Sequence, residues 1–175
     1  MYLDFEELLA ILNAREVRYL VVGGYAVAFH AQPRATKDLD LWVKPDLANA
    51  GALYDALAEF GAPLENLKPA DFAEAGSFFR MGTPPLMVDI LPEISGVDFD
   101  TVWSRRVESP VDADSGVIAP FISADDLLAA KLAAGRSQDL ADVAAIRAAQ
   151  KPPEQSRTAR TRGRAASRSA STVGT

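Results

Sequence analysis

The sequence of 175 residues contains no cysteine and only one histidine, His30. A chain without cysteine has no disulfide framework, no thiolate nucleophile and no sulfur-rich zinc site, and this composition is typical of a cytosolic protein. A single histidine cannot build a histidine-rich metal site. Because His30 lies among Ala28, Phe29 and Ala31, we interpret it as a packed or solvent-bonded imidazole, with general-base duty as the alternative.

Long apolar runs and targeting signals are also missing. No run approaches the roughly 20 apolar residues that a membrane helix needs. The N-terminal stretch MYLDFEELLAILNAREV carries acidic residues early and lacks the basic region of a secretory signal. We therefore expect a cytoplasmic protein without a membrane partner. Its apolar content of 49% is sufficient for one core and one domain.

Positive charge is scarce in the first 150 residues and concentrated at the C-terminal end. Residues 1–150 carry 12 Lys+Arg and 23 Asp+Glu, a net charge of −11, whereas residues 151–175 carry six and one, a net charge of +5. The basic segment is rich in Arg, Ser, Thr, Ala, Gly and Pro, so we expect a disordered tail. Two interpretations remain for it: an electrostatic arm for RNA or another polyanion, or a solvated low-complexity terminus.

The most informative stretch runs from Leu20 to Val43, with the sequence LVVGGYAVAFHAQPRATKDLDLWV. Its apolar start predicts a strand, and Gly23-Gly24 predicts a turn into a helix whose first N–H groups could face a phosphate. Strict alternation predicts a second strand with Asp38 and Asp40 on one face, about 6–7 Å apart along the backbone. Mg²⁺ commonly takes one or two protein carboxylates together with substrate phosphates.

This pattern resembles the signature of the DNA polymerase β-like nucleotidyltransferase superfamily, in which a glycine-glycine or glycine-serine turn precedes an acidic-x-acidic strand. Thirteen residues, Tyr25–Lys37, separate the two motifs here. The stretch is most similar to small prokaryotic members related to abortive-infection toxins. Many members carry serine after the glycine, and Tyr25 offers no equivalent hydroxyl, so the backbone amides of Gly23 and Gly24 would do more of the phosphate binding.

A third aspartate, Asp89, lies in the run Leu86–Leu91, which follows Ser77–Met81 and the turn Gly82–Pro85 in a strand–turn–strand pattern. An aspartate among apolar strand residues costs free energy unless it is paired or binds a cation. The superfamily resemblance implies that Asp89 joins Asp38 and Asp40 as metal ligand and catalytic carboxylate, with general-base duty as a further role. The alternative is an edge-strand aspartate that faces water.

Charged residues near the C-terminal helices form a second group. Two helices are predicted, from Ser123 to Gly135 and from Ser137 to about Ala149, the second with Leu140 inward. The resemblance implies that Lys131 contacts the nucleotide phosphates and that Asp139 lies nearby; the alternative for Lys131 is a snorkelling side chain. Arg136, Asp139 and Asp142 form either a structural ion-pair network or a nucleotide-side cluster.

The turn before the carboxylates supplies further candidates. Arg34 and Thr36 are assigned to nucleotide binding. Arg34 and Lys37 are placed to steer a triphosphate, and Thr36 is placed to cap the start of the strand. Surface charges on a polar turn are the alternative interpretation. Trp42 continues the face of Asp38 and Asp40, so it borders the base or belongs to the core.

The predicted fold class is α/β (α+β): a small mixed sheet with helices packed on it, formed by a nucleotidyltransferase-like domain over residues 1–150 and followed by a tail over residues 151–175. The run Val117–Ile122 contains Pro120, which predicts an edge or terminal strand.

The favoured function is a Mg²⁺-dependent enzyme, with two ions, that moves an NMP group from a nucleoside triphosphate to a hydroxyl and releases pyrophosphate. The resemblance implies RNA, tRNA or protein as acceptor and a toxin–antitoxin setting with an antitoxin partner. The alternatives are a non-catalytic binding protein with this fold and a small-molecule nucleotidyltransferase of the aminoglycoside type.

Overall fold

The computed structural model describes residues 1–32, 35–112 and 114–151. Arg34 and the predicted tail from residue 152 onward lie outside the described residues. None of the helices in the described ranges combines the length and apolar character of a bilayer-spanning segment.

Within the described ranges, six strands form one mixed sheet in the order β3-β4-β2-β1-β6-β5. The pairs β2–β4 and β1–β6 are parallel, and the other neighbours are antiparallel. The strands are β1 (Tyr19–Val22), β2 (Asp38–Val43), β3 (Phe79–Thr83), β4 (Leu86–Leu91), β5 (Val107–Pro110) and β6 (Ile118–Phe121).

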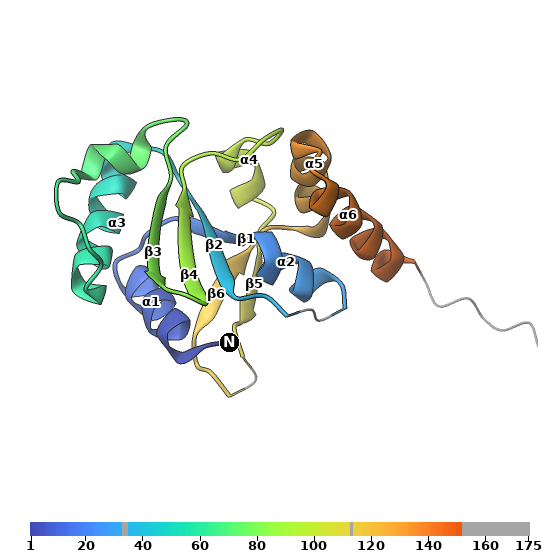
Figure 1. The fold of residues 1–175 in the computed structure, drawn as a ribbon, viewed down its shortest axis with the longest axis horizontal. Helices are drawn as coiled ribbons and strands as arrows, with labels where there is room; N and C mark the ends of the chain where they lie inside the picture. The colour runs from blue at the N-terminus through green and yellow to red at the C-terminus, as the bar shows by residue number, and fades with distance from the viewer. Residues whose placement is uncertain (33–34, 113, 152–175) are drawn as a thin grey trace, which may run out of the picture.

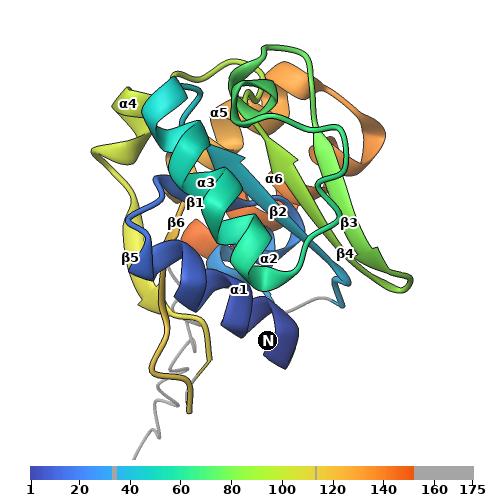
Figure 2. The ribbon, with the colours of Figure 1, turned by 90° about the vertical axis from the view of Figure 1, so that its left-hand side faces the viewer.

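Helices cover both faces of this sheet. Figures 1 and 2 show α1 and α3 over one face and α2, α5 and α6 on the opposite side. The prediction of an α/β fold with a small mixed sheet is confirmed. The helices are α1 (Leu3–Ala14), α2 (Gly23–His30), α3 (Leu47–Phe60), the 3₁₀ helix η1 (Pro69–Ala73), α4 (Phe99–Trp103), α5 (Ala124–Ala134) and α6 (Ser137–Gln150).

Local signals in the sequence determine where two of these helices begin and end. Asp46 caps α3 by accepting a hydrogen bond from the Asn49 N–H, and Gly61 ends the helix in the left-handed conformation. Ser123 caps α5 in the same way, and Gly135 ends it. The predicted boundaries of α5, Ser123 and Gly135, are therefore confirmed.

The hydrophobic core is continuous from the sheet to α1 and α3. It includes Leu39 and Leu41 of β2, which lie on the strand face opposite Asp38 and Asp40. The apolar half of the alternating pattern thus fixes the register of β2, and the polar half is left for the cleft side of the sheet.

The prediction of an edge position for the strand with Pro120 is wrong, because β6 lies between β1 and β5. Pro120 has no N–H to donate to a neighbouring strand. The register pair between β6 and β1 is Val21–Phe121, and the Ile122 N–H donates to the Val21 carbonyl oxygen at 3.1 Å. The pairing with β1 therefore begins after Pro120, so an internal strand tolerates the proline.

Candidate active site

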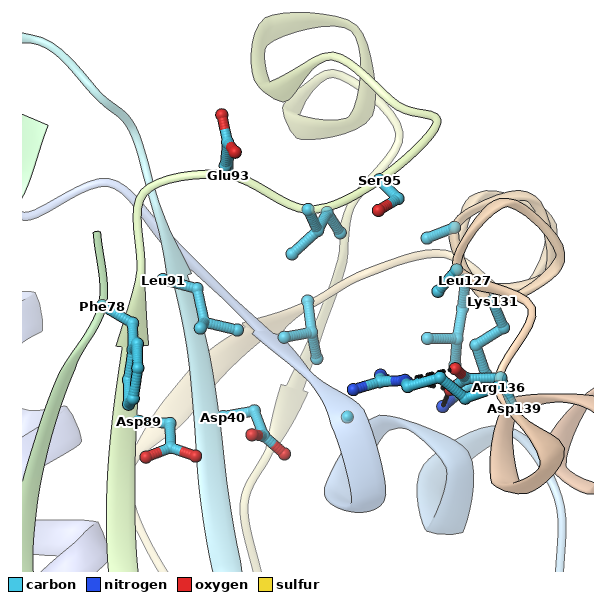
Figure 3. Close-up of a pocket in the computed structure, with 15 residues that line it drawn as sticks. Asp40, Phe78, Asp89, Leu91, Glu93, Ser95, Leu127, Lys131, Arg136 and Asp139 are labelled. Atoms are coloured by element: carbon cyan, nitrogen blue, oxygen red, sulfur yellow. Dashed lines mark hydrogen bonds and ion pairs between the residues drawn. The ribbon is translucent and has the colours of Figure 1, made fainter. Parts of the chain in front are cut away.

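A cleft of about 560 Å³ opens between the sheet and α5. Figure 3 shows Asp40 and Asp89 on the side of the sheet and Lys131, Arg136 and Asp139 on the helical side. An acidic wall therefore faces a wall that carries two cationic side chains.

The acidic wall depends on the parallel pairing of β2 with β4. Asp40 is the direct register partner of Asp89, and Asp38 is paired with Met87. The structure therefore brings the strand of Asp38 and Asp40 beside the strand of Asp89, which excludes the edge-strand interpretation of Asp89. Asp89 is 7% exposed.

The acidic wall also shifts the titration of Asp40. Burial raises the pKa of Asp40 to about 6, and the charges of Asp89 and Asp38 add to this effect. A hydrogen bond from the Gly24 backbone N–H and the charge of Lys131 act in the opposite direction without cancelling it. An additional positive charge near Asp40 would relieve this repulsion.

Gly23 allows the carboxylate of Asp40 to lie against the start of α2. A Cβ atom at position 23 would lie 1.9 Å from Oδ2 of Asp40, and the residue has a φ of +59°. Both the space and the backbone conformation therefore require glycine. In this structure Gly23 leaves space for the Asp40 carboxylate, and the Gly24 N–H donates a hydrogen bond to it. The assignment of both glycines to phosphate binding stays a prediction.

Asp89 is held by an arginine that the sequence-based prediction missed. Nε and one terminal nitrogen of Arg80 each donate to a different carboxylate oxygen of Asp89, both at 2.6 Å. The two residues are register partners across the β3–β4 hairpin. The observed turn has two residues, Pro84 and Pro85, and this length places Arg80 opposite Asp89. The predicted turn of four residues, Gly82–Pro85, would place Arg80 opposite Met87 instead.

The opposite wall contains a buried ion-pair network. Lys131 is 8% exposed, and its Nζ lies 2.8 Å from Oδ2 of Asp142 and 3.0 Å from Oδ1 of Asp139. The Nε of Arg136 lies 2.7 Å from Oδ2 of Asp139. Burial alone would raise the pKa of Asp139, but the hydrogen bonds and charges of Arg136 and Lys131 outweigh it and lower the pKa.

This network corrects two sequence-based interpretations. Lys131 is not a snorkelling side chain, because its charged end is buried between two carboxylates. Leu140 does not face inward: it is 53% exposed, while Asp139 and Asp142 occupy the inner side of α6. The cluster is both a structural ion-pair network and part of the cleft wall, since Lys131, Arg136 and Asp139 line the cleft.

Residues 3–150 match the family model described as "Nucleotidyltransferase of unknown function (DUF6036)". The chain belongs to this family. It is thus a nucleotidyltransferase, and the resemblance to the DNA polymerase β-like superfamily is confirmed. No curated protein sequence matches this nucleotidyltransferase.

Three solved structures share the fold of this nucleotidyltransferase. The antibiotic-resistance factor ANT(2'')-Ia gives a TM-score of 0.57 at 13% identity, covering 85% of this chain and 83% of the other. TM1012 of Thermotoga maritima, a candidate nucleotidyltransferase, gives 0.53 at 17% identity, covering 80% and 88%. The lincosamide antibiotic adenylyltransferase LnuA, solved with lincomycin, gives 0.50 at 14% identity, covering 85% and 98%.

Other predicted residues lie away from the cleft of this nucleotidyltransferase. The Thr36 hydroxyl lies 3.4 Å from the Asp38 carbonyl oxygen, next to the start of β2. The Nε2 atom of His30 lies 2.6 Å from the Ile122 carbonyl oxygen, as expected for a packed imidazole. Trp42 is buried in the core and donates to the Pro92 carbonyl oxygen, so it does not border a base.

The acidic wall provides oxygen ligands of the type that Mg²⁺ prefers. In the described parts of the chain, no group of three or more His, Asp or Glu side chains is placed to hold a metal ion, so Asp38, Asp40 and Asp89 do not form a three-carboxylate metal cluster. Asp40 and Asp89 nevertheless lie on adjacent strands, where burial first and then the charge of Asp89 raise the pKa of Asp40. This donor set fits an ion that takes its remaining ligands from substrate phosphates and water.

Replacing Gly23 by alanine is expected to disturb the acidic wall. The new Cβ would displace the Asp40 carboxylate, and the left-handed conformation would cost alanine about 1–2 kcal/mol. We expect a lower midpoint in urea unfolding and a loss of transfer from labelled triphosphate. Gly51→Ala within α3 is the matched control, because a Cβ there meets nothing within 4 Å. Equal behaviour of the two variants would contradict the close approach of Asp40 to Gly23.

Proposed function

We propose that the chain is a cytoplasmic, Mg²⁺-dependent nucleotidyltransferase that moves an NMP group from a nucleoside triphosphate to a hydroxyl of RNA, tRNA or a protein. The observation that carries this proposal is the cleft with Asp40 and Asp89 on one wall and Lys131 and Arg136 on the other. A triphosphate needs cationic partners for its oxygens, and the transferred phosphoryl group needs carboxylates that hold a divalent ion.

The reaction requires positioning and charge stabilisation more than covalent catalysis. The oxygen of the acceptor hydroxyl forms a bond to the α-phosphorus, and the bond from that phosphorus to the α,β-bridging oxygen breaks. Pyrophosphate leaves with the bonding electrons, and the hydroxyl proton passes to a carboxylate of the acidic wall. Lys131 and Arg136 offset the charge on the leaving pyrophosphate.

Asp38 and Asp40 are the residues that would hold Mg²⁺, and Asp89 lies beside them on the adjacent strand β4. The bound ion would polarise the phosphate oxygens as a Lewis acid. The chain itself contributes two things: β2 and β4 fix the carboxylates side by side, and Gly23 lets Asp40 approach the start of α2.

A small-molecule acceptor is the second candidate. Two of the structures that share the fold are the antibiotic-resistance factor ANT(2'')-Ia and the lincosamide adenylyltransferase LnuA. The net charge of −11 over residues 1–150 is also suited to a cationic acceptor. The chain covers 98% of LnuA, which was solved with lincomycin, so a fold of this extent can hold such an acceptor, and the labelling experiment below decides between the two candidates.

The setting that we propose is the toxin component of a toxin–antitoxin pair, with an antitoxin as protein partner. The rival is a non-catalytic member that binds a partner through the same fold. The two differ in their response to nucleotide. An enzyme is stabilised by triphosphate and Mg²⁺ through the acidic wall, whereas a pure binding protein associates with its partner whether or not nucleotide is present.

Labelling identifies both the nucleotide and the acceptor. The protein is incubated with each α-³²P nucleoside triphosphate and Mg²⁺, together with cellular RNA, cellular protein, or a panel of aminoglycosides and lincomycin. We expect one triphosphate to label the RNA or the protein pool and to release pyrophosphate. Label in the small molecules alone would establish the second candidate.

Asp38→Asn provides the matched control for this experiment, since it removes a negative charge that acts on Asp40 while keeping the shape of the side chain. We expect no label with this variant. The absence of label from every triphosphate and every pool with the wild-type chain would overturn the enzymatic proposal and favour the binding protein.

A further inference from the structure

Arg80 is a fixed cation beside the acidic wall. It lies on β3, which is paired only with β4 at the edge of the sheet in the described ranges. Its side chain is 50% exposed, whereas the side chain of Asp89 is 11% exposed. The guanidinium therefore reaches inward from the sheet edge to a buried carboxylate, with one N–H group on each oxygen.

This arrangement is a strong form of ion pairing. A bidentate arginine–carboxylate pair combines two charge-assisted hydrogen bonds with a fixed orientation. Hydrogen bonding to Asp89 is the main reason why the pKa of Arg80 is raised, and the charges of Asp38 and Asp40 contribute as well. Arg80 thus lies in the field of all three carboxylates.

A second divalent ion would compete with this guanidinium. A second ion would need a lone pair of Asp89, and each oxygen of Asp89 already directs one of its two lone pairs to Arg80. A dication placed there would also be repelled by the positive charge of Arg80.

The other two cations of the cleft form their ion pairs with carboxylates other than Asp89. Lys131 is committed to Asp139 and Asp142, and Arg136 is committed to Asp139. Arg80 is therefore the cation that compensates the third carboxylate.

We propose that the Arg80 guanidinium takes the place of a second divalent cation, so that the site binds a single Mg²⁺ together with the nucleoside triphosphate. This inference rests on the proposed function. Asp38 and Asp40 hold the ion, and Asp89 holds Arg80. Arg80 is then a positioning residue that supplies fixed positive charge beside the carboxylates.

The number of bound ions tests the proposal without relying on turnover. Mn²⁺ retained per chain is counted by equilibrium dialysis and electron paramagnetic resonance. The dialysis buffer contains a mixture of α,β-methylene analogues of ATP, GTP, CTP and UTP. We expect one Mn²⁺ per wild-type chain and two per Arg80→Gln chain, because Asp89 becomes available when the guanidinium is removed. The second ion should be lost again in Arg80→Gln/Asp89→Asn.

Three further variants control for folding and charge. Arg80→Lys keeps a positive charge at this position and should bind one ion. Asp89→Asn alone should also bind one ion, with an affinity within about twofold of the wild type. Arg15→Gln removes an arginine that pairs with Glu59 on the surface, so it should behave as the wild type. Thermal unfolding curves show whether each variant is folded, and the Asp89→Asn result tests the inference even where Arg80→Gln fails to fold.

The possible counts separate the inference from the proposed function. Two ions in the wild type would overturn the single-ion site while leaving the nucleotidyltransferase proposal intact. One ion in both the wild type and Arg80→Gln would likewise overturn the role of Arg80. No retained ion in the wild type would overturn the metal-dependent function itself, and the inference with it.

Discussion

Replacing Asp40 by asparagine is expected to lower nucleotidyl transfer by about a thousandfold, because a ligand that supports roughly 4 kcal/mol of charge stabilisation at the transition state is lost. The same substitution is expected to stabilise the fold at pH 8. The Asp40 carboxylate is half-buried beside Asp89 and Asp38, and removing its charge relieves both the burial penalty and the repulsion. Activity and stability should therefore change in opposite directions.

The gain in stability should depend on pH in a defined way. The pKa of Asp40 is about 6 in the folded chain and 3.8 as its ordinary value. Between these two values the native state binds more protons than the unfolded state, so the stability of the wild type falls as the pH rises from 4 to 6. The full difference is about 3 kcal/mol at 1.36 kcal/mol per pKa unit. The advantage of Asp40→Asn should be complete at pH 7–8 and should vanish near pH 4.

Urea unfolding in the presence of EDTA measures this effect without bound metal. Asp55→Asn is the matched control, because Asp55 is an exposed residue of α3 that should change stability by less than about 0.5 kcal/mol and leave transfer intact. If Asp40→Asn were less stable than the wild type at pH 8, the carboxylate would be a net contributor to the fold. If Asp40→Asn kept the nucleotidyl transfer activity of the wild type, Asp40 would not be a catalytic residue.

The parts of this site that the sequence predicted well are those that local periodicity determines. Alternation placed Asp38 and Asp40 opposite Leu39 and Leu41, because one face of β2 must join the core. The capping residues Ser123 and Gly135 predicted α5 for a similar reason, since each signal acts within one turn of the chain. The neighbouring position of Asp89 came from the superfamily resemblance, and the parallel pairing of β2 and β4 confirms it.

The sequence could not predict the features of the site that depend on contacts between separate strands or separate helices. A two-residue difference in the length of the β3–β4 turn decides whether Arg80 or another residue faces Asp89, and the apolar pattern of the hairpin does not determine that length. In α6, periodicity favoured an inward Leu140, but the buried charge of Lys131 on α5 draws Asp139 and Asp142 inward instead. A buried cation on one helix thus overrides the hydrophobic pattern of the next.

Replacing Lys131 by methionine is expected to cost about 3–5 kcal/mol of stability, the usual cost of removing one partner from a buried ion pair. Asp139 would keep Arg136 and Asp142 would keep Gln138, but both carboxylates would stay buried without the ammonium group between them. The unfolding free energy in urea measures the loss. Lys151→Met, at an exposed position, is the control and should be close to neutral.

A second substitution separates the two roles of Lys131, because the network and the phosphate site should respond differently to it. Adding Asp142→Asn to Lys131→Met removes one stranded charge, so part of the stability should return, while the affinity for triphosphate should stay low. The pKa of Asp139 lies below its ordinary value of 3.8, so its share of the network's stability is complete above that pH and is lost only as the pH falls further. The penalty of Lys131→Met should therefore persist at pH 5 and shrink below pH 3.8. Recovery of triphosphate affinity in the double variant would show that Lys131 only maintains the fold, and the phosphate contact would have to come from Arg136.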